Sequence, residues 1–160
     1  MADTLEKQVE QLLLAGEGKK AVLARLGTPA NRGRVIAVLN NKTLVARRHQ
    51  SMWLNLILAG ALLYVTLKRL LAISAAGHFD FYLLADFIVP TINFYILREI
   101  LRFHRMGYQL LVLLTALGLV YEANRVMPDL FIHLAMIGIA IALHLRLFPK
   151  NDLLPHDKKA

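Results

Sequence analysis

After residue 50, the chain alternates long apolar stretches with short charged ones. Crossing about 30 Å of hydrocarbon takes roughly 20 helical residues, with a usual range of about 17 to 25. Four runs approach this length, so they are predicted to be transmembrane helices. The third is short unless residues 121–125 continue it at the interface. The runs are 52–67 with an extension through 70–76, then 81–97, 106–121 and 130–148.

The first fifty residues show helical periodicity without a continuous apolar run. Leu5, Val9, Leu12 and Leu13 recur at the spacing of one helix face, which is typical of a helix with one buried side. Gly, Thr and Pro supply start and stop signals for two further helices. The expected helices are 3–16, capped by Asp3 or Thr4 and ended by Gly16; 19–26, ended by Gly27; and 29–41, capped by Thr28 with Pro29 in its first position.

These patterns predict an all-α integral membrane protein in three segments. Residues 1–50 would form a three-helix cytoplasmic head, residues 51–149 a four-helix transmembrane bundle, and residues 150–160 a cytoplasmic tail. Hydrophobic residues make up 57% of the chain, above the about 45–50% of soluble domains. This composition excludes a disordered chain, and the lack of Cys excludes disulfide scaffolds, thiolate nucleophiles and Cys-based metal sites.

The basic residues are distributed unequally between the two predicted sides of the membrane. Nine of the 19 Lys and Arg precede residue 51, three lie between 98 and 105, and four follow from 146 onward. Only Lys68, Arg69 and Arg125 lie on the other side. Because cytoplasmic loops hold the excess of basic residues, both termini are expected in the cytoplasm. Membrane orientation therefore accounts for most of the net charge of +8, and the chain is expected to be a multi-pass protein of a bacterial-type inner membrane.

Part of the head resembles a known DNA-binding unit. The stretch LLLAGEGKKAVLARLGTPANRGRVIAVLNN resembles the helix, turn and recognition helix of bacterial helix-turn-helix regulators. The resemblance implies that Asn31, Arg32 and Arg34 face the groove of DNA. Basic residues beside a membrane also contact anionic lipid, at about 1 kcal/mol each. Docking or lipid contact is the favoured interpretation of the head, and nucleic acid is not an expected partner.

One polar stripe falls inside the second predicted span. Asp86 and Asn93 are seven residues apart, which places them within about 20° of one helix face. Pro90 lies between them and would free the carbonyl of Asp86 from its helical hydrogen bond. Ionisable groups within a membrane are functional candidates. Two interpretations stay open, a clasp between helices, which is favoured, and a cation, proton or polar ligand site.

Charged residues also gather at both predicted membrane surfaces. Glu122 and Arg125, in the outer turn between spans three and four, are three residues apart and can pair on one helix face. A periplasmic ligand site is the alternative. The inner surface carries arginines expected to meet lipid headgroups or to dock the head. These are Arg47, Arg48, Arg98, Arg102 and Arg105.

Histidines raise the question of haem. His133 and His144 are eleven residues apart on span four, with His78 and His104 at matching depths. Two such pairs would resemble the bis-histidine sites of b-type cytochromes, whose ligands lie on facing helices. The spacing is shorter than in that family, and His78 and His104 fall in or near loops. Interfacial histidines without a metal or cofactor are therefore the expectation, with His104, His133 and His144 as the remaining haem candidates.

The function expected from these features is non-enzymatic. The chain has no Gly-x-Ser-x-Gly elbow, Walker loop or His-Glu-x-x-His motif. Small residues on the spans permit close contact with other helices or with a second copy. The favoured function is a scaffold or assembly subunit of a larger inner-membrane complex, with lipids and other membrane subunits as partners. The alternatives are a small oligomeric channel or membrane-perturbing effector lined by Asp86 and Asn93, and a b-type haem electron-transfer anchor.

Overall fold

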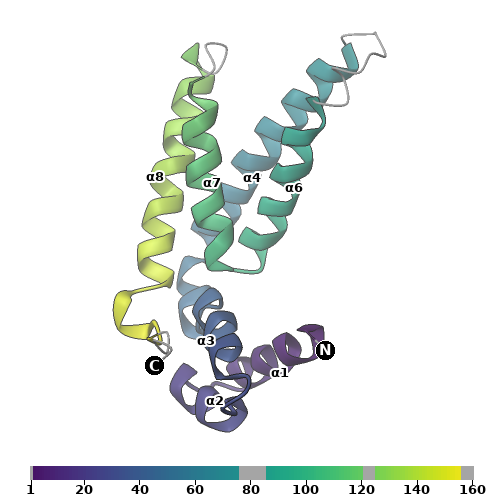
Figure 1. The fold of residues 1–160 in the computed structure, drawn as a ribbon. Coiled ribbons are helices and arrows are strands. Elements are labelled where there is room, and N and C mark those ends of the chain that lie inside the picture. The colour runs from purple at the N-terminus through teal and green to yellow at the C-terminus, as the bar shows by residue number, and fades with distance from the viewer. Residues whose placement is uncertain (1, 76–85, 121–124, 156–160) are drawn as a thin grey trace.

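A computed structural model describes residues 2–75, 86–120 and 125–155, and in these ranges the chain is helical without any β-strand (Figure 1). This agrees with the predicted all-α class. Three short helices form a head, and four longer helices form a bundle above it. The helices are α1 (Ala2–Leu14), α2 (Lys19–Leu26), α3 (Arg32–Asn41), α4 (Val45–Ala75), α6 (Ile88–Leu101), α7 (Arg105–Gly118), α8 (Asp129–Leu147) and the 3-10 helix η2 (Lys150–Asp152).

The head is a small helical unit with its own apolar core. Its predicted core face on α1 is confirmed, because Val9 and Leu13 are buried and Leu5 and Leu12 are partly buried against them. Gly16 ends α1 with φ +88°, a conformation in which glycine carries no steric penalty. Residues of α2, α3 and the C-terminal segment complete this core. They are Val22, Leu23, Val35, Ile36, Leu39 and Leu154.

The start of α3 differs from the prediction. The helix begins at Arg32, three residues after the expected position of Pro29. Thr28 does not cap it with its hydroxyl. Instead, the Asn31 side chain accepts a hydrogen bond from the Thr28 backbone N–H at 2.7 Å, and the Asn31 N–H donates to the Thr28 carbonyl. The Arg32 N–H also donates to the Thr28 carbonyl at 2.8 Å, so residues 28–31 form a hydrogen-bonded turn directly before the helix.

The four long helices form a closed, up-and-down ring. α4 contacts α6 and α8, and α7 contacts α6 and α8, so each helix has two neighbours. Apolar side chains fill the axis of the ring in its inner and middle parts, including Leu58, Leu62, Tyr108, Leu111 and Met136. Toward the end far from the head, α4 and α6 diverge from α7 and α8 (Figure 1).

The lengths of the helices bear on membrane insertion. Among the described residues, α4 and α8 are long and apolar enough to cross a membrane, with 31 and 19 residues. α6 and α7 have 14 residues each as described, fewer than the about 17 to 25 that a span usually needs. The first part of the predicted second span, 81–85, lies outside the described residues. Four membrane spans therefore stay a prediction.

Candidate functional site

The head and the bundle are joined by an ionic cluster around one buried lysine, which we call the junction. The side chain of Lys42, at the end of α3, is 1% exposed, and its Nζ lies 2.8 Å from Glu10 Oε2 and 3.2 Å from Glu6 Oε1. Arg102, at the end of α6, reaches the same two carboxylates at 3.3 and 3.5 Å. Burial alone would raise the pKa of Glu10, but the hydrogen bond from Lys42 and the nearby cations hold it below its usual value.

The turn between α6 and α7 brings a third carboxylate to the junction. His104 Nδ1 lies 2.8 Å from Glu99 Oε2, with both side chains buried. Burial lowers the pKa of His104, although Glu99 opposes the shift. Phe103 adopts φ +56° and closes a Schellman motif, in which the N–H groups of Phe103 and His104 donate to Ile100 and Glu99. The turn also pairs with the head, through an isolated antiparallel bridge from His104 to Lys42.

A polar clasp, made by Asn55 and Tyr108, ties three helices together just inside the bundle. The Tyr108 hydroxyl donates to Asn55 Oδ1 at 2.6 Å, and Asn55 Nδ2 donates to the Ile100 carbonyl at 3.0 Å. Both side chains are fully buried. These bonds satisfy polar groups that would be costly to leave unpaired.

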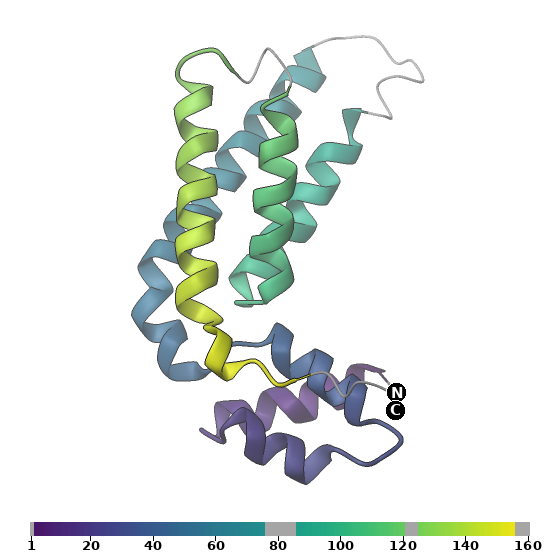
Figure 2. The ribbon, with the colours of Figure 1, turned by 60° about the vertical axis from the view of Figure 1, so that its left-hand side comes forward.

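The C-terminal segment is held against the head instead of extending away from it (Figure 2). The Asn40 side chain bonds both the N–H and the carbonyl of Leu154, at 2.8 and 2.9 Å. Arg47 pairs with Asp152 at 2.8 Å. Lys19 lies 5.9 Å above the ring of Phe148 at the end of α8. Burial lowers the pKa of Lys19 to about 8, although Asp152 opposes the shift.

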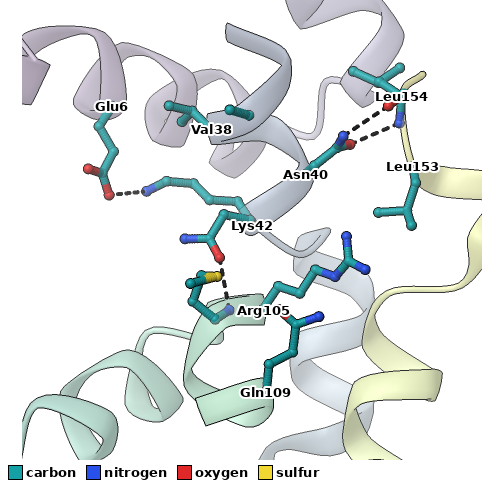
Figure 3. A pocket seen from close by; sticks show the side chains of 11 residues that line it. Glu6, Val38, Asn40, Lys42, Arg105, Gln109, Leu153 and Leu154 are labelled. Carbon is teal, nitrogen blue, oxygen red and sulfur yellow. Dashed lines mark hydrogen bonds and ion pairs between the residues drawn. The ribbon is translucent and has the colours of Figure 1, made fainter. Parts of the chain in front are cut away.

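A pocket of about 590 Å³ lies beside the junction, between α3, the start of α7 and the C-terminal segment. Figure 3 shows Arg105 extending from α7 toward Leu153, with Lys42 paired to Glu6 on another wall. Arg105 Nε is buried and has no hydrogen-bond partner in the described part of the chain. The Asn41 side chain accepts a bond from the Met106 N–H at 3.0 Å, which fixes the start of α7 to the head.

A second hollow, which we call the outer cavity, lies within the bundle at the end far from the head. It has a volume of about 600 Å³, and all four long helices line it. At its edge, Lys68 Nζ contacts both carboxylate oxygens of Asp129, at 2.7 and 2.5 Å. His133 is buried on the wall and bonds the Asp129 carbonyl through Nδ1 at 2.7 Å. Polar groups therefore lie around a largely apolar space.

The three residues of the predicted intramembrane stripe occupy different surroundings. Asp86 lies 3.6 Å from Arg69 of α4, and its side chain is 53% exposed at the outer end. Pro90 is buried in the first turn of α6, where a proline ring needs no kink because that N–H has no helical partner. Asn93 lines the outer cavity together with Arg69. The helices thus bring Asp86 and Asn93 near the same arginine.

The predicted outer-turn pair is described only in part, because Glu122 lies outside the described residues. Arg125 donates to the carbonyls of Leu119 and Val120, at 2.7 and 3.1 Å. It therefore caps the C-terminal end of α7, where free carbonyls and the helix dipole favour a cation.

The five inner arginines have four different surroundings in the structure. Arg47 and Arg102 bind carboxylates of the C-terminal segment and the head, as described above. Arg48 donates to the Thr43 carbonyl at 3.4 Å, and Arg105 lines the junction pocket. Arg98 stays largely exposed, 3.7 Å from Glu99.

The haem candidates lie apart along the bundle. His104 is held by Glu99 at the inner turn, and His133 by the Asp129 carbonyl at the outer cavity. His144 stacks near Phe148, with ring centroids 5.7 Å apart. His78 lies outside the described residues, and in the described part of the chain no three His, Asp or Glu side chains gather to hold a metal.

Several residues of these sites were not singled out by sequence reasoning. Lys42, Glu6 and Glu10 resemble ordinary exposed head charges, since nothing local marks them as buried partners. Asn55 and Tyr108 carried a signal, because each is a polar group within an apolar run. Comparison with family models, with curated proteins and with solved structures finds no match to this chain.

Proposed function

We propose that this chain is a multi-pass inner-membrane protein, with four spans and with its head and both termini in the cytoplasm. The observation that carries the proposal is the apolar outer surface of the bundle. Only 28% of the most apolar stretch of α4 and of α8 is buried within the protein, whereas a core helix of a soluble protein is mostly buried. Large apolar side chains face outward instead, among them Trp53, Leu71, Phe131 and Leu145.

The same argument extends to the two shorter helices. α6 and α7 pack beside α4 and α8 in one ring, so a membrane around the longer helices surrounds the shorter ones too. Their outward side chains are also apolar, including Phe94, Leu113 and Leu117. Arg102 and Arg105 lie at the inner end of the bundle. This is the end where the excess of Lys and Arg predicts the cytoplasm, according to the positive-inside rule.

Within this membrane protein we propose the role of a non-enzymatic scaffold or assembly subunit. The packed axis of the bundle supports this role over a channel, because Leu58, Leu62 and Tyr108 are buried there. Within one copy of the chain, Asp86 pairs with Arg69 at the outer end and does not line a pore. A channel lined by Asp86 and Asn93 would therefore have to form between several copies. The ion pairs of the junction support a head that is held against the bundle and displays its outer surface to other subunits.

The topology is tested with single cysteines, because the natural chain has none. We expect Ser74→Cys at the outer end to react with a membrane-impermeant maleimide in intact cells. Ala30→Cys on the head should react only after permeabilisation. Leu113→Cys, which is 55% exposed in the isolated protein, should react in neither case because lipid covers it. Labelling of Leu113→Cys by the impermeant reagent before detergent treatment contradicts the membrane proposal.

The scaffold role is tested by photo-crosslinking in cells of the source organism. A photoreactive residue at Ala30 or Arg34, both exposed on the head, should give a discrete adduct with another membrane subunit. The same residue at Leu117 is the control and should crosslink mainly to lipid. Adducts consisting only of this chain with itself, combined with ion flux in liposomes that Asp86→Asn abolishes, would replace the scaffold by the channel.

A further inference from the structure

The outer cavity combines polar side chains from every long helix with an apolar interior. Lys68 and Arg69 come from α4, Asn93 from α6, Thr115 from α7, and Asp129 and His133 from α8. Leu62, Leu111 and Met136 form the apolar part. A bundle that used this region for packing alone would fill it with apolar side chains, as its inner half does.

At the cavity the main acceptor, the Asp129 carboxylate, is already occupied, whereas an arginine donor is not. Asp129 already receives Lys68 on both carboxylate oxygens. Arg69, whose side chain is 40% exposed, lies 3.6 Å from Asp86, and its buried Nε has no hydrogen-bond partner among the residues that the structure describes. An arginine fork of this kind is suited to a carboxylate or a phosphate, which accepts two parallel bonds. The missing partner at this site is therefore an anionic acceptor.

We propose that the outer cavity binds an amphiphile with an anionic headgroup and an acyl chain. Arg69 would hold the carboxylate or phosphate, and the chain would lie along Leu62, Leu111 and Met136. A volume of about 600 Å³ falls within the about 300–1,000 Å³ of small-molecule sites. Access from the outer leaflet rests on the proposed membrane topology, whereas the cavity and the position of Arg69 on its wall do not.

The proposal is tested by titrating the full chain, in nanodiscs of zwitterionic phosphatidylcholine, with a fluorescent fatty acid that has a free carboxylate. Unlabelled palmitate, palmitoyl lysophosphatidate and monopalmitoylglycerol then compete with the probe. We expect saturable binding and displacement by at least one of the two anionic competitors. Displacement by palmitate alone identifies a fatty-acid site, and displacement by lysophosphatidate alone identifies a phospholipid site. The neutral monopalmitoylglycerol should compete at least 10-fold more weakly.

Two pairs of variants locate the ligand. Arg69→Gln should weaken binding at least 10-fold, whereas Arg146→Gln removes an equal charge from an exposed position at the inner end of α8 and should change it less than twofold. Ala72→Phe places a ring in the cavity from an exposed lining position and should abolish saturable binding. Ala142→Phe adds the same ring to the outside of α8 and should leave binding unchanged.

Equal competition by neutral and anionic amphiphiles would overturn the proposal, and so would binding that survives both Arg69→Gln and Ala72→Phe. The cysteine labelling described above reports on membrane insertion separately. Insertion without Arg69-dependent binding refutes only the cavity proposal. Binding that depends on Arg69, in a chain that detergent-free labelling shows to be water-exposed, refutes only the membrane proposal.

Discussion

At its inner end the bundle is tied to the head by Lys42, Arg102 and two glutamates, while at its outer end two helix pairs diverge around a cavity of about 600 Å³. Both ends contain ion pairs, but they differ in burial. Lys42 is 1% exposed and Lys68 is 52% exposed. Exposed pairs contribute little to stability. The inner end therefore holds the fold together, and the outer end is left free to bind.

Among substitutions that would weaken the inner end, we expect the largest loss of stability at Gly107, at the start of α7. A Cβ atom there would lie 2.9 Å from the Ile100 backbone nitrogen and 2.9 Å from Glu99 Cβ. The backbone cannot move without separating α6 from α7, so Gly107→Ala should destabilise the protein by about 3 kcal/mol. Thermal unfolding in mild detergent measures the change.

Gly138 provides the matched control on α8. A Cβ atom at Gly138 meets nothing within 4 Å, so Gly138→Ala should leave the unfolding temperature unchanged or slightly raised. Equal destabilisation by both substitutions would show that the tight contact between α6 and α7 is not what supports the inner end.

The next largest effect concerns the buried lysine of the junction. Lys42→Met keeps the aliphatic stem but leaves Glu6 and Glu10 with Arg102 alone. Breaking a fully buried pair costs about 3–5 kcal/mol. Because the two glutamates are 37% and 28% exposed, we expect about 2 kcal/mol. The corresponding outer substitution, Lys68→Met, should leave the unfolding temperature nearly unchanged. A larger effect at Lys68 than at Lys42 would reverse the comparison between the two ends.

A smaller effect is expected in the polar clasp beside the junction. Tyr108→Phe removes the hydroxyl that donates to Asn55 Oδ1 and leaves a buried acceptor unpaired. We expect a loss of about 1–2 kcal/mol in the free energy of unfolding. Tyr95→Phe, at a half-exposed position on α6, is the control and should have no effect. The clasp would be dispensable if the two variants unfolded at the same temperature.

The sequence pattern locates the helices well because burial and periodicity are local signals. The predicted run 130–148 differs from α8 by one residue at each end, and Gly16 and Gly27 end α1 and α2 as predicted. The contacts between distant side chains could not be predicted from the sequence in this way. Lys42 meets Glu10 across 32 residues, and only the docking of α1 against α3 and α6 decides that contact. The outer cavity depends in the same way on how two helix pairs diverge, which no single helix encodes.

The smallest expected effect is the response of the junction to acid. The folded pKa of His104 lies below its unfolded value of about 6.5, because burial outweighs the hydrogen bond to the Glu99 carboxylate. Between these two values the unfolded chain binds more protons than the folded one. The free energy of unfolding should therefore fall as the pH drops below 6.5, by at most about 1.4 kcal/mol per pH unit. Glu10 adds a second loss below its usual pKa, since its folded pKa is also lowered.

Variants separate the histidine from the other acid-sensitive groups. His104→Gln keeps a polar side chain that can bond Glu99 but does not titrate, so its stability should fall less steeply between pH 7 and pH 5.5 than that of the natural chain. His49→Gln, at an exposed position, should retain the slope of the natural chain. Unfolding temperatures of the two variants and the natural chain, measured between pH 7 and pH 5.5, test this prediction. If His104→Gln lost stability with acid as steeply as the natural chain, the acid response would have to come from groups other than His104, and the contact between His104 and Glu99 would not be the pH-sensitive part of the inner end.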